Sequence, residues 1–177
     1  MIYKLKSHIP SSTLFMLYSS LILPYLNYGI LAWGNTHKNL LDRLLLLQKK
    51  SLRIICNTAF RSQTDPSFFD NKILKIRDLY LFQLGQFMYN YNKNTLPQIF
   101  DTMFPKNLSF HNYSTRQSND FHLPLLRTSL AKNTFIYDGP KFWNSLSNDI
   151  KDTPSLNVFK NRLKTFLLKL YNNSQNN

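Results

Sequence analysis

The chain has 177 residues; 22 are Lys or Arg and 9 are acidic, which gives a formal net charge of +13. It has one Cys and four Gly, which excludes a disulfide framework and a cysteine zinc site, and leaves little material for a Gly-rich phosphate loop. Because 43% of the residues are hydrophobic, the chain can bury a core.

The first predicted element lies between His8 and His37, a stretch without a formal charge. Apolar residues at three- and four-residue steps predict a helix from about Leu14 to Tyr25, which Ser11 or Ser12 could cap. Pro24 should kink or end this helix. Residues 9–36 are also long enough to span a bilayer, but their polar residues favour a buried helix pair, and a membrane-anchored protein is the less favoured alternative.

Two stronger helices follow. Apolar periodicity predicts one from Asn39 to Ile55, with an inward stripe that includes Gln48, and another from Ile76 to Tyr91. Gly85 inside the second costs about 1 kcal/mol relative to Ala unless packing requires a small residue. We expect a loop over 61–72, with a turn at Asp65, and a short helix over 96–104.

The last third of the chain is less regular. Residues 121–137 suggest short extended or β segments, and Gly139-Pro140 suggests a break. A final helix should begin after Ser155, which is its expected cap. Its predicted buried face consists of Leu156, Phe159, Leu163, Phe166, Leu167 and Leu170. The prediction is therefore a mainly α-helical bundle of four to six helices, with regions 1–104 and 105–177 forming one continuous unit.

No catalytic constellation is recognisable in the sequence. The nine Asp residues are scattered, the four His stand alone, and no metalloprotease, nucleophile-elbow, Walker or Rossmann motif occurs. We therefore expect no catalytic residues, no metal site, no cofactor and no enzymatic activity from this chain by itself.

Basic residues are the most informative feature. Residues 1–60 carry 7 basic and 1 acidic residue, residues 61–120 carry 7 basic and 5 acidic residues, and residues 121–177 carry 8 basic and 3 acidic residues. This excess of basic over acidic residues favours an anionic partner, most commonly nucleic acid; the alternative is a solvated Lys-rich surface. The candidate phosphate-binding residues are Lys49, Lys50, Arg53, Arg116, Arg127 and Lys141. Tyr113 and Trp143 are candidates for base stacking, although Trp143 is more simply read as a core anchor.

Several short motifs, in order along nearly the whole chain, resemble the region after the polymerase palm of animal non-LTR retrotransposon reverse transcriptases of the jockey or LINE type. These motifs are Pro24 to Gly29 with Trp33-Gly34, Leu44 to Lys50 with Arg53 to Ile55, Tyr113 to Arg116, Gly139 to Leu146, and Phe159 to Lys164.

The resemblance implies a thumb and C-terminal region that grips template and primer. The catalytic Tyr-x-Asp-Asp motif of the family, which binds two Mg²⁺ ions, does not occur here, nor does the Cys/His knuckle of some relatives, and Ser147 replaces a common proline. We therefore expect a truncated protein of this type that binds RNA or DNA without catalysis, in the nucleus or cytoplasm and not secreted. The alternative is an inert or structural fragment whose ancestral packing partner was the missing palm domain.

Overall fold

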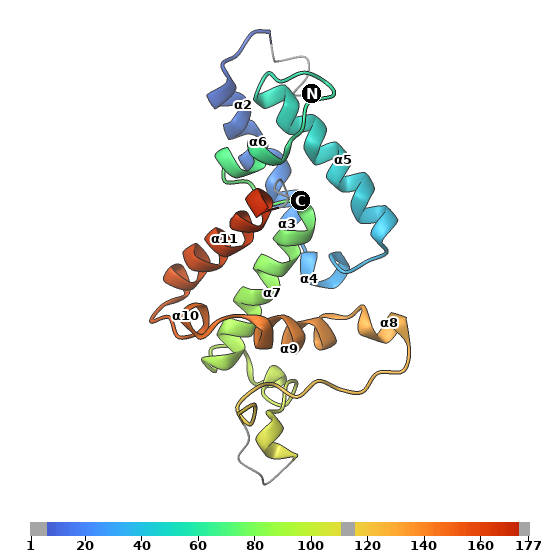
Figure 1. The fold of residues 1–177 in the computed structure, drawn as a ribbon, viewed down its shortest axis with the longest axis vertical. Helices are drawn as coiled ribbons and strands as arrows, with labels where there is room; N and C mark the ends of the chain where they lie inside the picture. Colours follow the sequence, from blue (N-terminus) through green and yellow to red (C-terminus); the bar gives the residue numbers. More distant parts are fainter. Residues whose placement is uncertain (1–6, 111–115, 174–177) are drawn as a thin grey trace. The chain divides into compact units, whose positions relative to one another are not determined.

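The computed structural model describes residues 7–110 and 116–173, and within these ranges the chain is mainly α-helical, as predicted (Figure 1). The described residues form no strand; their extended pairing is a single antiparallel bridge between Lys106 and Phe121. The helices are α2 (Ser11–Leu17), α3 (Leu23–Asn27), α4 (Ile30–Trp33), α5 (Lys38–Ile55), α6 (Asp65–Asp70), α7 (Ile76–Asn92), α8 (Ser129–Lys132), α9 (Phe135–Ser145), α10 (Asn148–Lys151) and α11 (Leu156–Asn173). A π-helical turn spans Tyr18–Ile22, and 3₁₀ turns span Gln98–Phe100 and Asn107–Ser109.

The chain divides into two compact units. Unit 1 comprises residues 1–80 and 164–177, and unit 2 comprises residues 81–163. These units differ from the predicted regions 1–104 and 105–177, because the two long helices α7 and α11 each contribute residues to both units.

The uncharged N-terminal segment folds as α2, the π turn and α3 in succession. The π turn, which is wider than an α-helical turn, ends just before Pro24. Pro24 lies in the first turn of α3, where the missing backbone amide of a proline costs little. The predicted serine cap is wrong, because Pro10 precedes α2 and no side chain caps it. Gly29 has a φ of 60°, a conformation that suits glycine and separates α3 from α4. None of the described helices has both the length and the apolar character needed to cross a membrane.

The core of unit 1 is organised around Gln48, whose side chain is only 3% exposed. Its Nε2 donates to the Tyr18 hydroxyl at 3.0 Å and to the Leu74 carbonyl at 2.8 Å. Its Oε1 accepts from the Ile76 amide at 3.0 Å. One side chain of α5 therefore ties the N-terminal helical segment and the start of α7 to the same point.

The expected loop over 61–72 contains a helix, which is a correction. Helix α6 begins at Asp65 and places Pro66 in its first turn, where proline fits a helix. Phe68 of α6 is fully buried and packs edge-on against Tyr171, with ring centroids 6.4 Å apart. The burial of this one ring supports a helix that is too short to be recognised by its periodicity.

In unit 2, α9 crosses the part of α7 that follows Leu81 (Figure 1). The helices approach closely at two glycines: a Cβ at Gly85 of α7 would lie 2.5 Å from Leu163 Cδ2 of α11 and 3.3 Å from the Phe142 ring of α9, and one at Gly139 of α9 would lie 2.8 Å from Met88 Sδ of α7. Gly85 therefore lies in a place that favours a small residue. Gly139-Pro140 does not break the chain as predicted; both residues are buried inside α9, where tertiary packing offsets the cost of the proline.

Within the segment 121–137, which was predicted to be extended, only the beginning pairs as an extended strand would. Phe121 pairs with Lys106, and its backbone amide and carbonyl both bond to the Asn144 side chain, at 3.1 and 2.8 Å. Residues 129–132 and those from 135 onward are helical. The segment predicted as a helix over 96–104 contains only the 3₁₀ turn Gln98–Phe100.

The C-terminal helix α11 matches its prediction closely. The Ser155 hydroxyl accepts from the Val158 amide at 3.4 Å, so Ser155 caps the helix as expected. Phe159, Leu163 and Leu167 are fully buried. Phe166 and Leu170, assigned to the buried face, are exposed, whereas Leu168 and Tyr171 are buried, so the buried stripe in the last part of α11 is displaced around the helix from the predicted one.

We predict that Gln48→Leu lowers the free energy of unfolding by at least about 2 kcal/mol, because an apolar side chain of similar size leaves three buried polar groups without their partner. Urea unfolding followed by far-UV circular dichroism measures this loss. The control is Gln86→Leu, since the Gln86 amide bonds to Phe82 within its own helix. An equal loss in the two variants would contradict the assignment.

Candidate functional site

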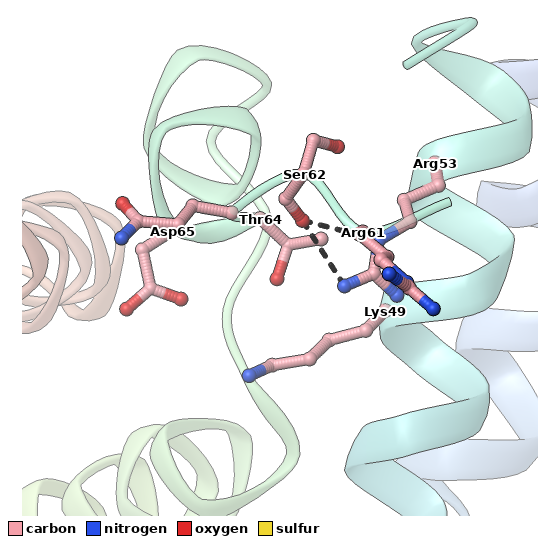
Figure 2. Close-up of a pocket in the computed structure, with 7 residues that line it drawn as sticks. Lys49, Arg53, Arg61, Ser62, Thr64 and Asp65 are labelled. Carbon is pink, nitrogen blue, oxygen red and sulfur yellow. Dashed lines mark hydrogen bonds between the residues drawn. The ribbon is translucent and has the colours of Figure 1, made fainter. Parts of the chain in front are cut away.

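A pocket of about 630 Å³ opens beside the C-terminal half of α5 in unit 1 (Figure 2). Helix α5 supplies two of its lining residues, and the segment that leads into α6, together with the first residue of α6, supplies the others. The lining residues are Lys49, Arg53, Arg61, Ser62, Gln63, Thr64 and Asp65. This pocket is called the cationic pocket below.

The helical repeat of α5 brings the first two cations together. Lys49 and Arg53 are four residues apart, so their side chains leave the same face of the helix. Figure 2 shows Lys49 extending from α5 toward the segment that carries Thr64 and Asp65. Gln48, the residue before Lys49, is buried in the core of unit 1. Its core hydrogen bonds therefore fix the rotation of α5 that presents both cations.

A braced turn brings the third cation. The Ser62 amide and hydroxyl both donate to the Ala59 carbonyl, at 3.1 and 2.7 Å. Arg53 donates from Nε and Nη2 to the Ser62 carbonyl, at 3.3 and 3.1 Å, as the dashed lines in Figure 2 show. The turn Ala59–Ser62 is thereby attached to α5, and it carries Arg61 at the pocket.

The far wall of the cationic pocket is held by contacts with α6 and Lys75. Thr64 is buried, and its carbonyl accepts from the Phe68 amide at the start of α6. Asp65 supplies the single carboxylate of the lining, and it forms an ion pair of 2.9 Å with Lys75.

The lining of the cationic pocket carries a net positive charge. Neither of the ion pairs found among residues 7–110 and 116–173 includes a lining cation: they join Lys75 to Asp65 and Arg77 to Asp42. The one carboxylate of the pocket is therefore neutralised by a lysine outside the lining, and the charge of the three lining cations remains. Such a site suits an anion with several acceptor oxygens, such as a phosphate group.

Behind the ion pair, a partly buried cluster connects α11 to the start of α7. The Tyr171 hydroxyl donates to Asp78 Oδ2 at 2.6 Å and accepts from the Lys75 amide at 2.9 Å. Lys75 Nζ lies 4.3 Å from the centroid of the Tyr171 ring. Burial raises the pKa of Asp78, and the hydrogen bond from Tyr171 opposes this rise by favouring the ionised carboxylate. Burial and the charge of Asp78 raise the pKa of Tyr171, so its hydroxyl remains a donor.

The predicted phosphate-binding residues are only partly brought together. Lys49 and Arg53 share the cationic pocket, whereas Lys50 is exposed on α5 and does not line it. The second predicted set, Arg116, Arg127 and Lys141, lies in unit 2, and all three are exposed. Lys141 Nζ lies 5.8 Å from the centroid of the Tyr137 ring.

The stacking candidates fare differently. Trp143 is only 5% exposed, and its ring lies between those of Phe121 and Phe159, at 6.4 and 5.9 Å. Its role is that of a core anchor, and it is not available to stack on a base. Tyr113 lies outside the described residues.

Sequence reasoning missed Arg61. It has no helical periodicity to mark it, and only its position shortly after a helix with basic residues could have drawn attention to it. No group of three His, Cys, Asp or Glu side chains that could hold a metal ion is found among the residues that the structure describes.

No protein-family model, no curated protein and no solved structure matches this chain. The resemblance to retrotransposon reverse transcriptases therefore stays a hypothesis, carried by the short motifs alone.

We predict that Tyr171→Phe raises the pKa of Asp78 further, because the carboxylate loses the hydrogen bond that favours its ionised form. The loss in unfolding free energy should be larger at pH 7 than below the raised pKa of Asp78, since the hydrogen bond from Tyr171 is stronger to the ionised carboxylate than to the neutral acid. A carboxyl NMR titration and urea unfolding at pH 7 and about pH 3, which is below the ordinary pKa of an Asp, measure the two effects.

The control for this pH dependence is Tyr89→Phe, whose lost hydroxyl donates to the backbone carbonyl of Thr153, which does not titrate. That variant should lose the same free energy at both pH values. A pKa of Asp78 that falls in Tyr171→Phe would refute the assignment.

Proposed function

We propose that the chain binds the sugar-phosphate backbone of nucleic acid through electrostatic attraction and catalyses no reaction by itself. The observation that carries the proposal is the cationic pocket, in which Lys49, Arg53 and Arg61 converge and the only carboxylate is paired elsewhere. Its polar lining and positive charge suit a phosphate oxygen better than an apolar ligand.

The distribution of charge supports the same function. Unit 1, which contains the cationic pocket, has 13 Lys and Arg against 4 Asp, a net charge of +9, and unit 2 has 9 against 5, a net charge of +4. Each phosphate that a basic side chain neutralises releases condensed counterions. Binding of this kind is weakly dependent on sequence and strongly dependent on salt.

The proposed origin is a reverse-transcriptase-like protein of the non-LTR retrotransposon type that corresponds to the region after the palm. In that origin the cationic pocket would contact the template or primer backbone. The sequence holds no Tyr-x-Asp-Asp motif, so this chain would grip nucleic acid without copying it.

We predict that the chain binds a fluorescent single-stranded oligonucleotide at low salt, with an affinity that falls steeply as salt rises. Lys49→Gln combined with Arg61→Gln should weaken binding and flatten the slope of log K against log salt by roughly 1.4, because two phosphate contacts are lost. Fluorescence anisotropy measures both quantities. Arg53 is left unchanged because it braces the turn Ala59–Ser62.

The matched control is Lys38→Gln combined with Arg43→Gln, which removes the same charge from exposed positions nearer the start of α5. Its effect should be clearly smaller. Equal effects of the two double variants would show that the pocket binds no better than the rest of a diffuse positive surface. The absence of binding at low salt would refute the proposed function.

An interaction with another polypeptide is the second candidate function, favoured by exposed leucines on α5. Leu40 and Leu47 are both exposed and lie seven residues apart, hence on one side of the helix, next to exposed Leu46. Such a surface could have packed on a palm domain and would promote self-association without it.

On this second hypothesis, sedimentation velocity should show concentration-dependent association that Leu40→Gln combined with Leu47→Gln abolishes. Lys38→Gln with Arg43→Gln, on the same helix, serves as the control. A chain that stays monomeric over the accessible concentration range would contradict this candidate.

A further inference from the structure

The side chain of Phe60 is 78% exposed. Tyr25 and Tyr28 of the same unit are also exposed, at 82% and 85%, but of these three aromatic residues only Phe60 is next in sequence to a residue that lines the cationic pocket. Phe68, which follows in α6, is by contrast fully buried. Exposure of a phenyl ring is costly in water, so a ring held in this way is well suited to contact a ligand.

The backbone that carries Phe60 is held in place. Phe60 and Arg61 are the two central residues of the turn Ala59–Ser62, which is closed by the two hydrogen bonds from Ser62 to the Ala59 carbonyl. Arg53 ties the same turn to α5 through the Ser62 carbonyl. The exposed ring is thus presented by a braced turn and not by a frayed end.

The same turn places the ring next to positive charge. Phe60 directly precedes Arg61, so their Cα atoms are about 3.8 Å apart, and Arg61 lines the cationic pocket. A turn that carries an exposed apolar ring and, at the next residue, a cation of the pocket combines the two features by which proteins bind single-stranded nucleic acid, a stacking surface for a base and cations for the backbone.

We propose that Phe60 and the cationic pocket form one site for a single-stranded nucleotide, with the base stacked on the Phe60 ring and its phosphate held by Lys49 and Arg61. The exposed Gln63 amide, which also lines the pocket, supplies a further donor to the phosphate or sugar. The proposal rests on the proposed function and adds a preference to it: the bases of a duplex are already stacked on each other, so the site selects single strands.

The test compares three variants of Phe60 on three probes: a thymidine 15-mer, an abasic strand of the same length, and a 15-base-pair duplex. Phe60→Ala and Phe60→Leu should weaken binding of the thymidine strand roughly five- to hundredfold, because stacking on an aromatic ring is lost. Phe60→Trp should retain or strengthen it. Binding of the abasic strand and of the duplex should be unchanged in all three variants.

Two results would overturn the proposal. Full binding of the thymidine strand by Phe60→Leu would show that an aromatic face is not needed, as expected if the ring serves a protein partner. An equal loss on the abasic strand would show that the variants disturb the cations instead of a stacked base. In both cases the proposed function survives if Lys49→Gln with Arg61→Gln still weakens binding; it fails as well only if the unaltered chain binds none of the probes.

Discussion

The buried amide of Gln48 is the interaction on which the arrangement of unit 1 depends. It joins α5 to Tyr18 in the N-terminal segment and to the backbone that enters α7, and it does so at a point with almost no solvent. Because an unmatched buried amide is costly, only one rotation and register of α5 satisfies all three partners. Lys49, the next residue, and Arg53, one turn later, therefore leave α5 in a fixed direction.

From that fixed helix the cationic pocket is assembled by local contacts. Arg53 reaches the Ser62 carbonyl and so holds the turn that carries Phe60 and Arg61. The buried ring of Phe68 anchors α6, whose first residue, Asp65, is occupied by Lys75. The core thus supplies the geometry and leaves the positive charge at the surface, where an anionic ligand can meet it.

The sequence was sufficient for the long helices and insufficient for the features that depend on tertiary contact. Periodicity identified α5, α7 and α11, including the inward position of Gln48, because each has a long buried stripe. It missed α6, whose one fully buried ring is Phe68. It also placed a break at Gly139-Pro140, where both residues are buried inside α9 and Gly139 lies close to Met88. Local propensity cannot report such contacts.

In the candidate site, too, the sequence indicates what depends on a single helix and misses what depends on tertiary contact. Lys49 and Arg53 could be paired from their spacing on one helix, whereas Arg61 joins them only through a turn whose bracing is a matter of three-dimensional structure. Trp143 illustrates the converse: its residue type suggested stacking, and its burial assigns it to the core. Phe60, which no motif marks, carries an exposed ring and directly precedes Arg61 of the pocket.

The most direct test of the central claim is to locate the bound strand on the chain. In an NMR titration of the isotopically labelled chain with a single-stranded oligonucleotide, the largest shifts should fall on the amides of residues 59–64 and on the side chains of Lys49 and Arg53. Largest shifts around Arg116, Arg127 and Lys141 in unit 2, or no shifts at low salt, would contradict the account.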